Sequence, residues 1–297
     1  MSKGVGNIPD LGLGAGENSG SLSSDIQLGA WISAFGRMSD AHPDMARILR
    51  VVERLQDRPF RAHVVIYGEP GTGKEGLAKL LHRLMHPQGA PAHRANLSGR
   101  SLVDLSRLLF HESGLFVQAE RGSLLVDELL AMPLEVQRDV HEYVQNHPPH
   151  GDSGVALISL TDGDLPLAVQ QGRFRHDLAY RLMRVVLHVP PLRERPQDIA
   201  HSTLWTCNRI LRKHHDDRAA EVFDPRSDAV PDQTFFVEPE AISRLKGHDW
   251  PGNFRELEAV IERALMLYGD EHRLRAADIE AALADNWPPV FLPETNS

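Results

Sequence analysis

Cysteine is almost absent from this sequence of 297 residues, in which Cys207 stands alone. A single thiol cannot close an internal disulfide, and no Cys and His pairs stand at the spacing of zinc ligands. The sixteen histidines are scattered, and we interpret their one dense patch, His214-His215, as a solvated polar face. We therefore expect chemistry that depends neither on thiols nor on structural zinc.

Long apolar runs and an excess of positive charge are missing as well. No stretch reaches the roughly 18 uninterrupted apolar residues of a membrane helix, and the first residues lack the basic start and apolar run of a secretory signal. Thirty-two Lys and Arg stand against 41 Asp and Glu, a formal net charge of −9 that repels a phosphate backbone. We expect a cytoplasmic protein without membrane association or direct DNA binding.

The composition that remains is that of a globular chain, 41% hydrophobic and long enough for one large and one small domain. The first residues are rich in Gly and Ser, helices and strands then alternate, and the pattern becomes wholly helical after Pro190-Pro191. We predict a flexible segment over residues 1–35, an α/β core over 36–192, an all-helical subdomain over 193–285 and a tail over 286–297.

Apolar periodicity and turn residues predict the individual elements. In the core, helices are predicted at residues 45–55, after Lys74 and at 134–144, and strands at 64–67, 123–126, 155–160 and 185–189. In the subdomain, helices are predicted at 199–213, 239–246, 253–267 and 276–284. Polar residues with Pro225 and Pro231 predict that 216–233 is an inserted surface loop.

A glycine-rich stretch lies between the predicted strand 64–67 and the helix that follows. It consists of Gly68, Glu69, Pro70, Gly71, Thr72, Gly73 and Lys74. In this context, backbone amides and a helix N-terminus bind phosphates, and the lysine reaches the β- and γ-phosphates of ATP. Glu75 follows where a Ser or Thr hydroxyl usually contacts Mg²⁺, so another group must help to hold the metal.

Two carboxylates follow the apolar strand that begins at Ser123. We predict that Asp127 holds Mg²⁺ through water and that Glu128 orients or polarises the attacking water. A strand ending in Asp-Glu is common as the start of a turn, and only its pairing with the glycine-rich loop makes it strong evidence for a P-loop ATPase.

Four blocks of the sequence resemble the bacterial enhancer-binding proteins, the AAA+ activators of sigma-54 RNA polymerase. The blocks are residues 68–75, 122–129, 174–182 with 190–195, and 250–257. The similarity spans residues 36 to 285. It implies an AAA+ P-loop NTPase core with a parallel sheet, followed by a lid. It also implies ATP and Mg²⁺ as cofactors, a ring of like subunits that is usually hexameric, and sigma-54 or a regulatory protein as partner.

The resemblance also assigns roles to residues. Arg175 and Arg181 match arginine fingers that reach the γ-phosphate held by a neighbouring subunit, and Arg255 matches the sensor arginine of the lid. Asn96 resembles the asparagine that switches the catalytic glutamate. Thr161-Asp162 stands where the family has a Thr-Asn sensor pair, and a carboxylate there could repel the γ-phosphate and impair hydrolysis.

Two features of the family have no counterpart in the sequence. The stretch from Leu109 to Ser113 runs directly into Gly114, so the loop Gly-Ala-Phe-Thr-Gly-Ala that pushes on sigma-54 is expected to be deleted. A loop can be removed without loss of the core because closure entropy grows slowly with length. We also expect no carboxy-terminal helix-turn-helix for DNA.

Three functions remain open at this level. The first is an oligomeric ATPase that regulates transcription through protein partners. The second is a weakly hydrolysing or non-hydrolysing subunit that modulates a full-length relative in a mixed ring. The third is an AAA+ remodeller of a client outside transcription, contacted through residues 216–233 or the amino-terminal segment.

Overall fold

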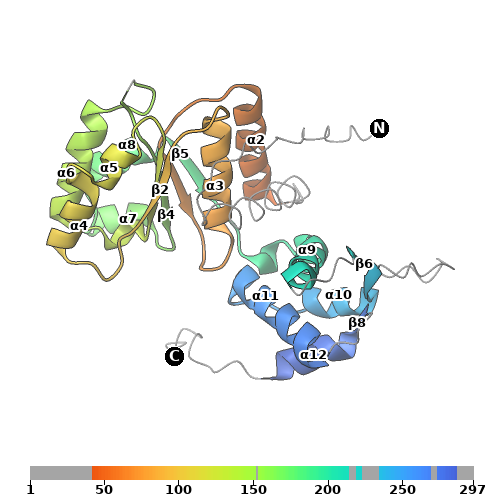
Figure 1. Cartoon of the computed structure of the whole chain (residues 1–297). Coiled ribbons are helices and arrows are strands. Elements are labelled where there is room, and N and C mark those ends of the chain that lie inside the picture. The colour runs from red at the N-terminus through yellow and green to blue at the C-terminus, as the bar shows by residue number, and fades with distance from the viewer. Residues whose placement is uncertain (1–41, 152, 214–218, 223–233, 269–272, 286–297) are drawn as a thin grey trace.

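The computed structural model describes residues 42–151, 153–213, 219–222, 234–268 and 273–285. The expectations for segment 1–35 and tail 286–297 lie outside these residues, as does most of the expected insertion 216–233. The described chain forms an α/β part and, below it in Figure 1, a smaller, mainly helical part.

A five-stranded parallel sheet in the order β2-β3-β4-β1-β5 forms the centre of the α/β part. The strands are β1 (Val64–Tyr67), β2 (Ala92–Asn96), β3 (Ser123–Asp127), β4 (Ala156–Thr161) and β5 (Val185–His188). All but β2 were expected. The edge strand β2 buries only Ala95 among its five residues, so it lacks the apolar run that reveals a central strand.

Helices cover both faces of this sheet (Figure 1). One face is covered by α2 (Pro43–Asp57) and α3 (Lys74–Met85). The other is covered by α4 (Leu102–Phe110), α5 (Leu115–Gln118), α6 (Leu134–Asn146), α7 (Leu165–Gln170) and α8 (His176–Leu182). Each face has its own buried apolar cluster. In α2 the stripe is built from Met45, Ile48, Val52 and Leu55, at the spacing of one helix face.

The smaller part contains four helices and three short strands among the described residues. The helices are α9 (Asp198–Lys213), α10 (Pro239–Lys246), α11 (Asn253–Arg263), which continues into a π-helical turn (Ala264–Tyr268), and α12 (Ala276–Ala284). All four were expected close to these bounds.

The strands β6 (Ala219–Val222), β7 (Thr234–Val237) and β8 (Arg273–Leu274) form a parallel sheet in that order. They correct the expectation of an all-helical subdomain and place a strand inside the expected surface loop. The physical reason is the β-branched and aromatic sequence of β7, whose Phe235 and Val237 join the buried cluster under α9 to α12.

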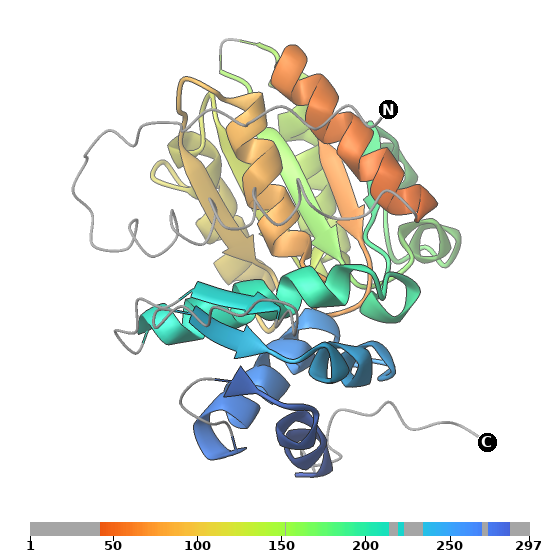
Figure 2. The same cartoon turned by 90° about the vertical axis from the view of Figure 1, so that its right-hand side faces the viewer.

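The helical part lies at the carboxyl ends of the core strands (Figure 2). The amide of Phe254, near the start of α11, donates a hydrogen bond of 3.0 Å to the carbonyl of Gly71 in the loop after β1. Carboxyl ends of parallel strands are where ligands bind in α/β folds. The helical part therefore covers the place where the sequence predicts a phosphate site.

Candidate functional site: the loop after β1

The loop between β1 and α3 has the conformation of a phosphate cradle. Gly71 and Gly73 have φ of 77° and 101°, in the left-handed region that glycine tolerates, and α3 begins directly afterwards at Lys74. A Cβ on Gly71 would lie 2.4 Å from the carbonyl oxygen of Gly252, so the loop also needs glycine there for close approach to the lid. The backbone amides and the helix N-terminus supply the donors that an anion requires.

The Lys74 ammonium is buried in this loop. Its Nζ donates to the carbonyl of Gly68 at 2.6 Å and to that of Glu69 at 2.9 Å, and it forms an ion pair with Asp162. The hydroxyl of Thr72 donates to the Glu69 carbonyl at 2.9 Å and is therefore directed into the loop. The structure thus places Asp162, predicted as a sensor residue, directly beside the lysine of the predicted loop.

The loop is joined to the lid region through its own residue Glu69, whose side chain binds two residues of the lid region. Arg193, in the 3-10 turn Leu192–Glu194, donates two hydrogen bonds of 2.9 and 2.6 Å to this carboxylate. Asn253 adds a third of 3.1 Å and a further bond of 3.0 Å to the carbonyl of Pro70. These donors, first Arg193, lower the pKa of Glu69.

Arg195 is the second residue that fixes the loop, and it is fully buried. Its guanidinium donates to the carbonyl of Thr72 at 2.9 Å, lies 4.8 Å above the ring of Phe254, and approaches Asp198 to 3.7 Å. Burial lowers the pKa of Arg195 to about 10. Arg195 and Asn253 stand in blocks that resemble the family, but no local pattern of the sequence indicates these contacts.

The predicted carboxylates stand at the end of β3, next to β2. Arg94 of β2 donates to Asp127 at 2.5 Å and to Glu75 at 3.1 Å, so its guanidinium links the two acids. The hydrogen bond to Asp127 is the main reason that the pKa of Arg94 is raised. Glu128 has a left-handed backbone with φ of 57°, and its pKa is raised by burial and by the charges of Asp162 and Asp127.

This arrangement fits a divalent cation. Mg²⁺ binds one or two carboxylates together with phosphate oxygens and water. Asp127 and Glu75 stand near the first residue of α3, and a positive guanidinium already bridges them. Arg94 was not predicted as a site residue, because a basic residue in a polar edge strand gives no local signal of this role.

The predicted sensor residues have internal partners. The carboxamide oxygen of Asn96 accepts from the Ser98 amide at 2.9 Å, although its backbone is in register with Asp127. The Thr161 hydroxyl is bonded to Gly163, accepting from its amide at 3.1 Å and donating to its carbonyl at 3.3 Å. Arg255 lies beside the loop: a Cβ added to Gly71 would be 3.2 Å from the Cβ of Arg255.

Arg175 and Arg181 are placed away from the loop of their own chain. Arg175, at the N-cap of α8, binds Asp177 through two hydrogen bonds of 3.0 and 2.6 Å. Arg181 in α8 reaches α6, where it donates to His141 at 3.2 Å and to Gln145 at 3.1 Å. In Figure 1, α8 and α3 lie on opposite sides of the sheet. Within one chain the structure does not bring these arginines to the phosphate loop.

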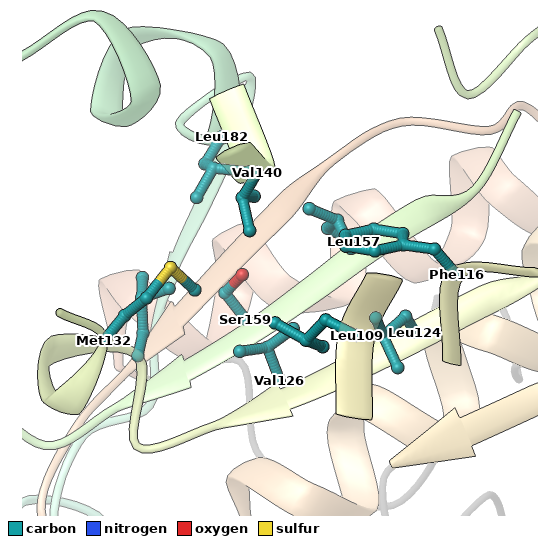
Figure 3. A pocket seen from close by; sticks show the side chains of 10 residues that line it. Leu109, Phe116, Leu124, Val126, Met132, Val140, Leu157, Ser159 and Leu182 are labelled. Atoms are coloured by element: carbon teal, nitrogen blue, oxygen red, sulfur yellow. The ribbon is translucent and has the colours of Figure 1, made fainter. Parts of the chain in front are cut away.

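A small cavity inside the core is distinct from this site (Figure 3). It lies between the sheet and the helices α4, α6 and α8, and its lining is apolar except for Ser159. A core hollow without charged groups offers nothing to a nucleotide. Among the described residues, no hydrogen-bond partner faces the buried Ser159 hydroxyl.

The parallel sheet, the glycine loop ending in Lys74 and the carboxylates after β3 define an AAA+ P-loop NTPase. The model of the sigma-54 interaction domain matches residues 38–188, and that of the AAA+ ATPase lid domain matches 226–289. The first match covers half of the chain. The chain belongs to the sigma-54 interaction domain family.

Curated relatives agree with this assignment. The DNA-binding transcriptional regulator NtrC of Azospirillum brasilense is 33% identical over 275 residues, covering 85% of this chain and 53% of the relative. The regulatory protein AtoC of Escherichia coli is 32% identical over 266 residues, covering 83% and 52%. The chain therefore spans about half the length of these relatives.

Solved structures share the fold. NtrX from Brucella abortus in complex with ADP has a TM-score of 0.66 at 23% identity, covering 94% of this chain and 62% of that one. The Holliday junction branch migration motor RuvB of Thermotoga maritima has a TM-score of 0.55 at 13% identity, covering 84% and 70%. Within the described residues, no helix is both long and apolar enough to cross a membrane.

Proposed function

We propose that this chain binds ATP with Mg²⁺ and is an oligomeric ATPase that regulates transcription through protein partners in the cytoplasm. The observation that carries the proposal is the position of Lys74 in a left-handed glycine loop, facing the acidic ends of β3 and β4. In this proposal the core 36–192 binds the nucleotide and the lid 193–285 responds to it through Arg255, Asn253 and Arg195.

The catalytic roles follow from the chemistry of the side chains. Asp127 would hold Mg²⁺ through water, and the metal would neutralise phosphate charge. Glu128, next to it, would orient the attacking water. The raised pKa of Glu128 suits a group that exchanges a proton with that water. Asn96 could switch the position of Glu128 by a hydrogen bond, provided that its carboxamide oxygen first releases the Ser98 amide.

The placement of Arg175 and Arg181 supports assembly. Both lie away from the loop of their own chain, and an arginine that stabilises the transition state can come from another subunit. We propose a ring, hexameric by analogy with the family, of this chain alone or with related AAA+ subunits. Arg175→Ala should leave ATP binding intact and reduce turnover that depends on assembly.

The connection between α4 and α5 bears on the partner. Helix α4 ends at Phe110 and α5 begins at Leu115, so four residues separate them. This short connection supports the deletion of the loop that contacts sigma-54. We therefore propose that the chain acts on sigma-54 RNA polymerase through a regulatory protein or a full-length relative.

The test is steady-state ATP hydrolysis as a function of protein concentration, with Glu128→Gln as the control for contaminating activity. A rate that rises more than proportionally with concentration and is lost in Glu128→Gln supports an assembling ATPase. Lys74→Ala should abolish nucleotide binding, and unchanged ATP affinity in that variant contradicts the site assignment.

A second function is favoured by the ion pair between Lys74 and Asp162. A carboxylate paired with the phosphate-binding lysine disfavours binding of the γ-phosphate of ATP. This is expected of a subunit that hydrolyses ATP weakly or not at all and modulates a relative in a mixed ring. Tight nucleotide binding without turnover, together with capture of a full-length relative, would favour it. Capture of neither that relative nor sigma-54 would favour a remodeller of another client.

A further inference from the structure

The Lys74 ammonium has three N–H donors, and three acceptors surround it in this structure. They are the carbonyl of Gly68 at 2.6 Å, the carbonyl of Glu69 at 2.9 Å and the carboxylate of Asp162. The lysine of such a loop binds the β- and γ-phosphates of a nucleotide. Each phosphate oxygen that Lys74 binds must therefore replace one of these acceptors, and the charged one is Asp162.

Asp162 is the first residue after strand β4, so the sheet fixes where its backbone begins. It follows Thr161, the last residue of β4, which is in register with Tyr67 at the end of β1. The amide of Gly68 donates to the Thr161 carbonyl at 3.3 Å, so the starts of the two loops are tied together. The carboxylate is thus built into the site beside the lysine.

Carboxylates gather at this position. Asp162, Glu128 and Asp127 bring three carboxylates to the ends of β3 and β4, and the Thr161 hydroxyl is bonded to Gly163. Arg94, the cation next to them, is bound to Asp127 and Glu75. A terminal phosphate that approaches Lys74 therefore meets the negative charge of Asp162 and is disfavoured unless that ion pair breaks.

We infer that the loop binds nucleoside diphosphates in preference to triphosphates, because Asp162 takes the place on Lys74 that a terminal phosphate would need. This inference rests on the nucleotide site proposed above and specifies its ligand. A diphosphate keeps the ion pair and replaces one carbonyl acceptor, whereas a triphosphate also has to displace Asp162. The site would then report the ADP-bound state to the lid.

The test is the affinity of the full chain for ADP and for ATP, each with Mg²⁺, measured by titration calorimetry. The chain should bind ADP more tightly than ATP. Asp162→Asn removes the charge and adds an amide donor, so it should tighten ATP binding about tenfold, which corresponds to about 1.4 kcal/mol, and leave ADP affinity within about threefold. Asp162→Glu keeps the charge and should retain the preference for ADP.

The outcomes separate this inference from the proposed function. An affinity for ATP equal to or higher than that for ADP in the unaltered chain, or an ATP affinity that Asp162→Asn leaves unchanged, would overturn the diphosphate preference and leave the nucleotide site intact. Binding of neither nucleotide by any of the three proteins would overturn both. Equal gains of ATP affinity in Asp162→Asn and Asp162→Glu would show that shape and not charge sets the preference, and would also overturn the inference.

Discussion

The guanidinium of Arg195 donates a hydrogen bond of 2.9 Å to the carbonyl of Thr72, so a fully buried arginine joins the lid to the phosphate loop. The same side chain lies over the ring of Phe254, whose amide binds Gly71. Two contacts from neighbouring lid residues therefore reach consecutive parts of the loop. A change of loop conformation on nucleotide binding would be transmitted to α11 by these contacts.

Replacing this arginine should destabilise the protein strongly. Arg195→Met removes a buried cation that pairs with Asp198 and donates to the Thr72 carbonyl, and loss of one partner of a buried pair costs about 3–5 kcal/mol. Urea unfolding measures the change. Arg193→Met is the matched control, because the half-exposed pair of Arg193 with Glu69 should contribute at most about 1 kcal/mol. Equal losses in the two variants would contradict the role given to Arg195.

The bridge made by Arg94 should compete with the metal. Arg94→Met removes the guanidinium between Asp127 and Glu75, and two unneutralised carboxylates attract Mg²⁺ more strongly. The Mg²⁺ concentration needed for half-maximal nucleotide binding should fall severalfold in a metal titration. Arg244→Met removes the same charge from a lid ion pair with Glu280 and should have no such effect. A higher requirement for Mg²⁺ in Arg94→Met would refute the competition.

The hydroxyl of Ser159 should lower the free energy of unfolding. It is buried beside the apolar cavity, and a buried hydroxyl without a hydrogen bond costs about 1–3 kcal/mol. Ser159→Ala should therefore raise the free energy of unfolding by about 1 kcal/mol in urea titrations. A decrease by that amount would mean that the hydroxyl has a partner in solution.

Acid should destabilise the chain through two buried histidines. Burial is the main cause that lowers the pKa of His63 and of His82 from 6.5 to about 4, and His63 accepts a hydrogen bond from the Leu157 amide at 3.2 Å. Below pH 6.5 the unfolded chain takes up protons that the folded chain does not. Stability is therefore lost as the pH falls from 6.5 towards 4, by up to about 3 kcal/mol for each histidine.

The measurement is urea unfolding between about pH 6.5 and 5, since carboxylates with ordinary or lowered pKa take up protons mainly below this range. His63→Gln keeps an acceptor for the Leu157 amide and should lose its share of the slope. His150→Gln, at an exposed position, should keep the full slope. An unchanged slope in His63→Gln would contradict the assignment.

Local patterns in the sequence were sufficient for most elements and for the phosphate loop. A stripe such as Met45, Ile48, Val52 and Leu55 repeats at the helix period, and a buried strand followed by glycines and Lys74 is a continuous motif. The strands β2 and β6 to β8 were missed. Strand β2 buries only Ala95 and so has no apolar run, and β8 has only two residues. Their pairing depends on neighbours that are distant in sequence.

The electrostatics of the site were decided by the tertiary structure. The strand order places β1 between β4 and β5, and this order alone brings Asp162 to Lys74. Contact between Asn253 and Glu69, or between Arg94 and Asp127, likewise joins residues whose separation in sequence carries no periodic signal. The sequence by itself determined the phosphate motif and the elements with a clear apolar period, since these depend on near neighbours. Only the packing of sheet and lid determined which charges meet there.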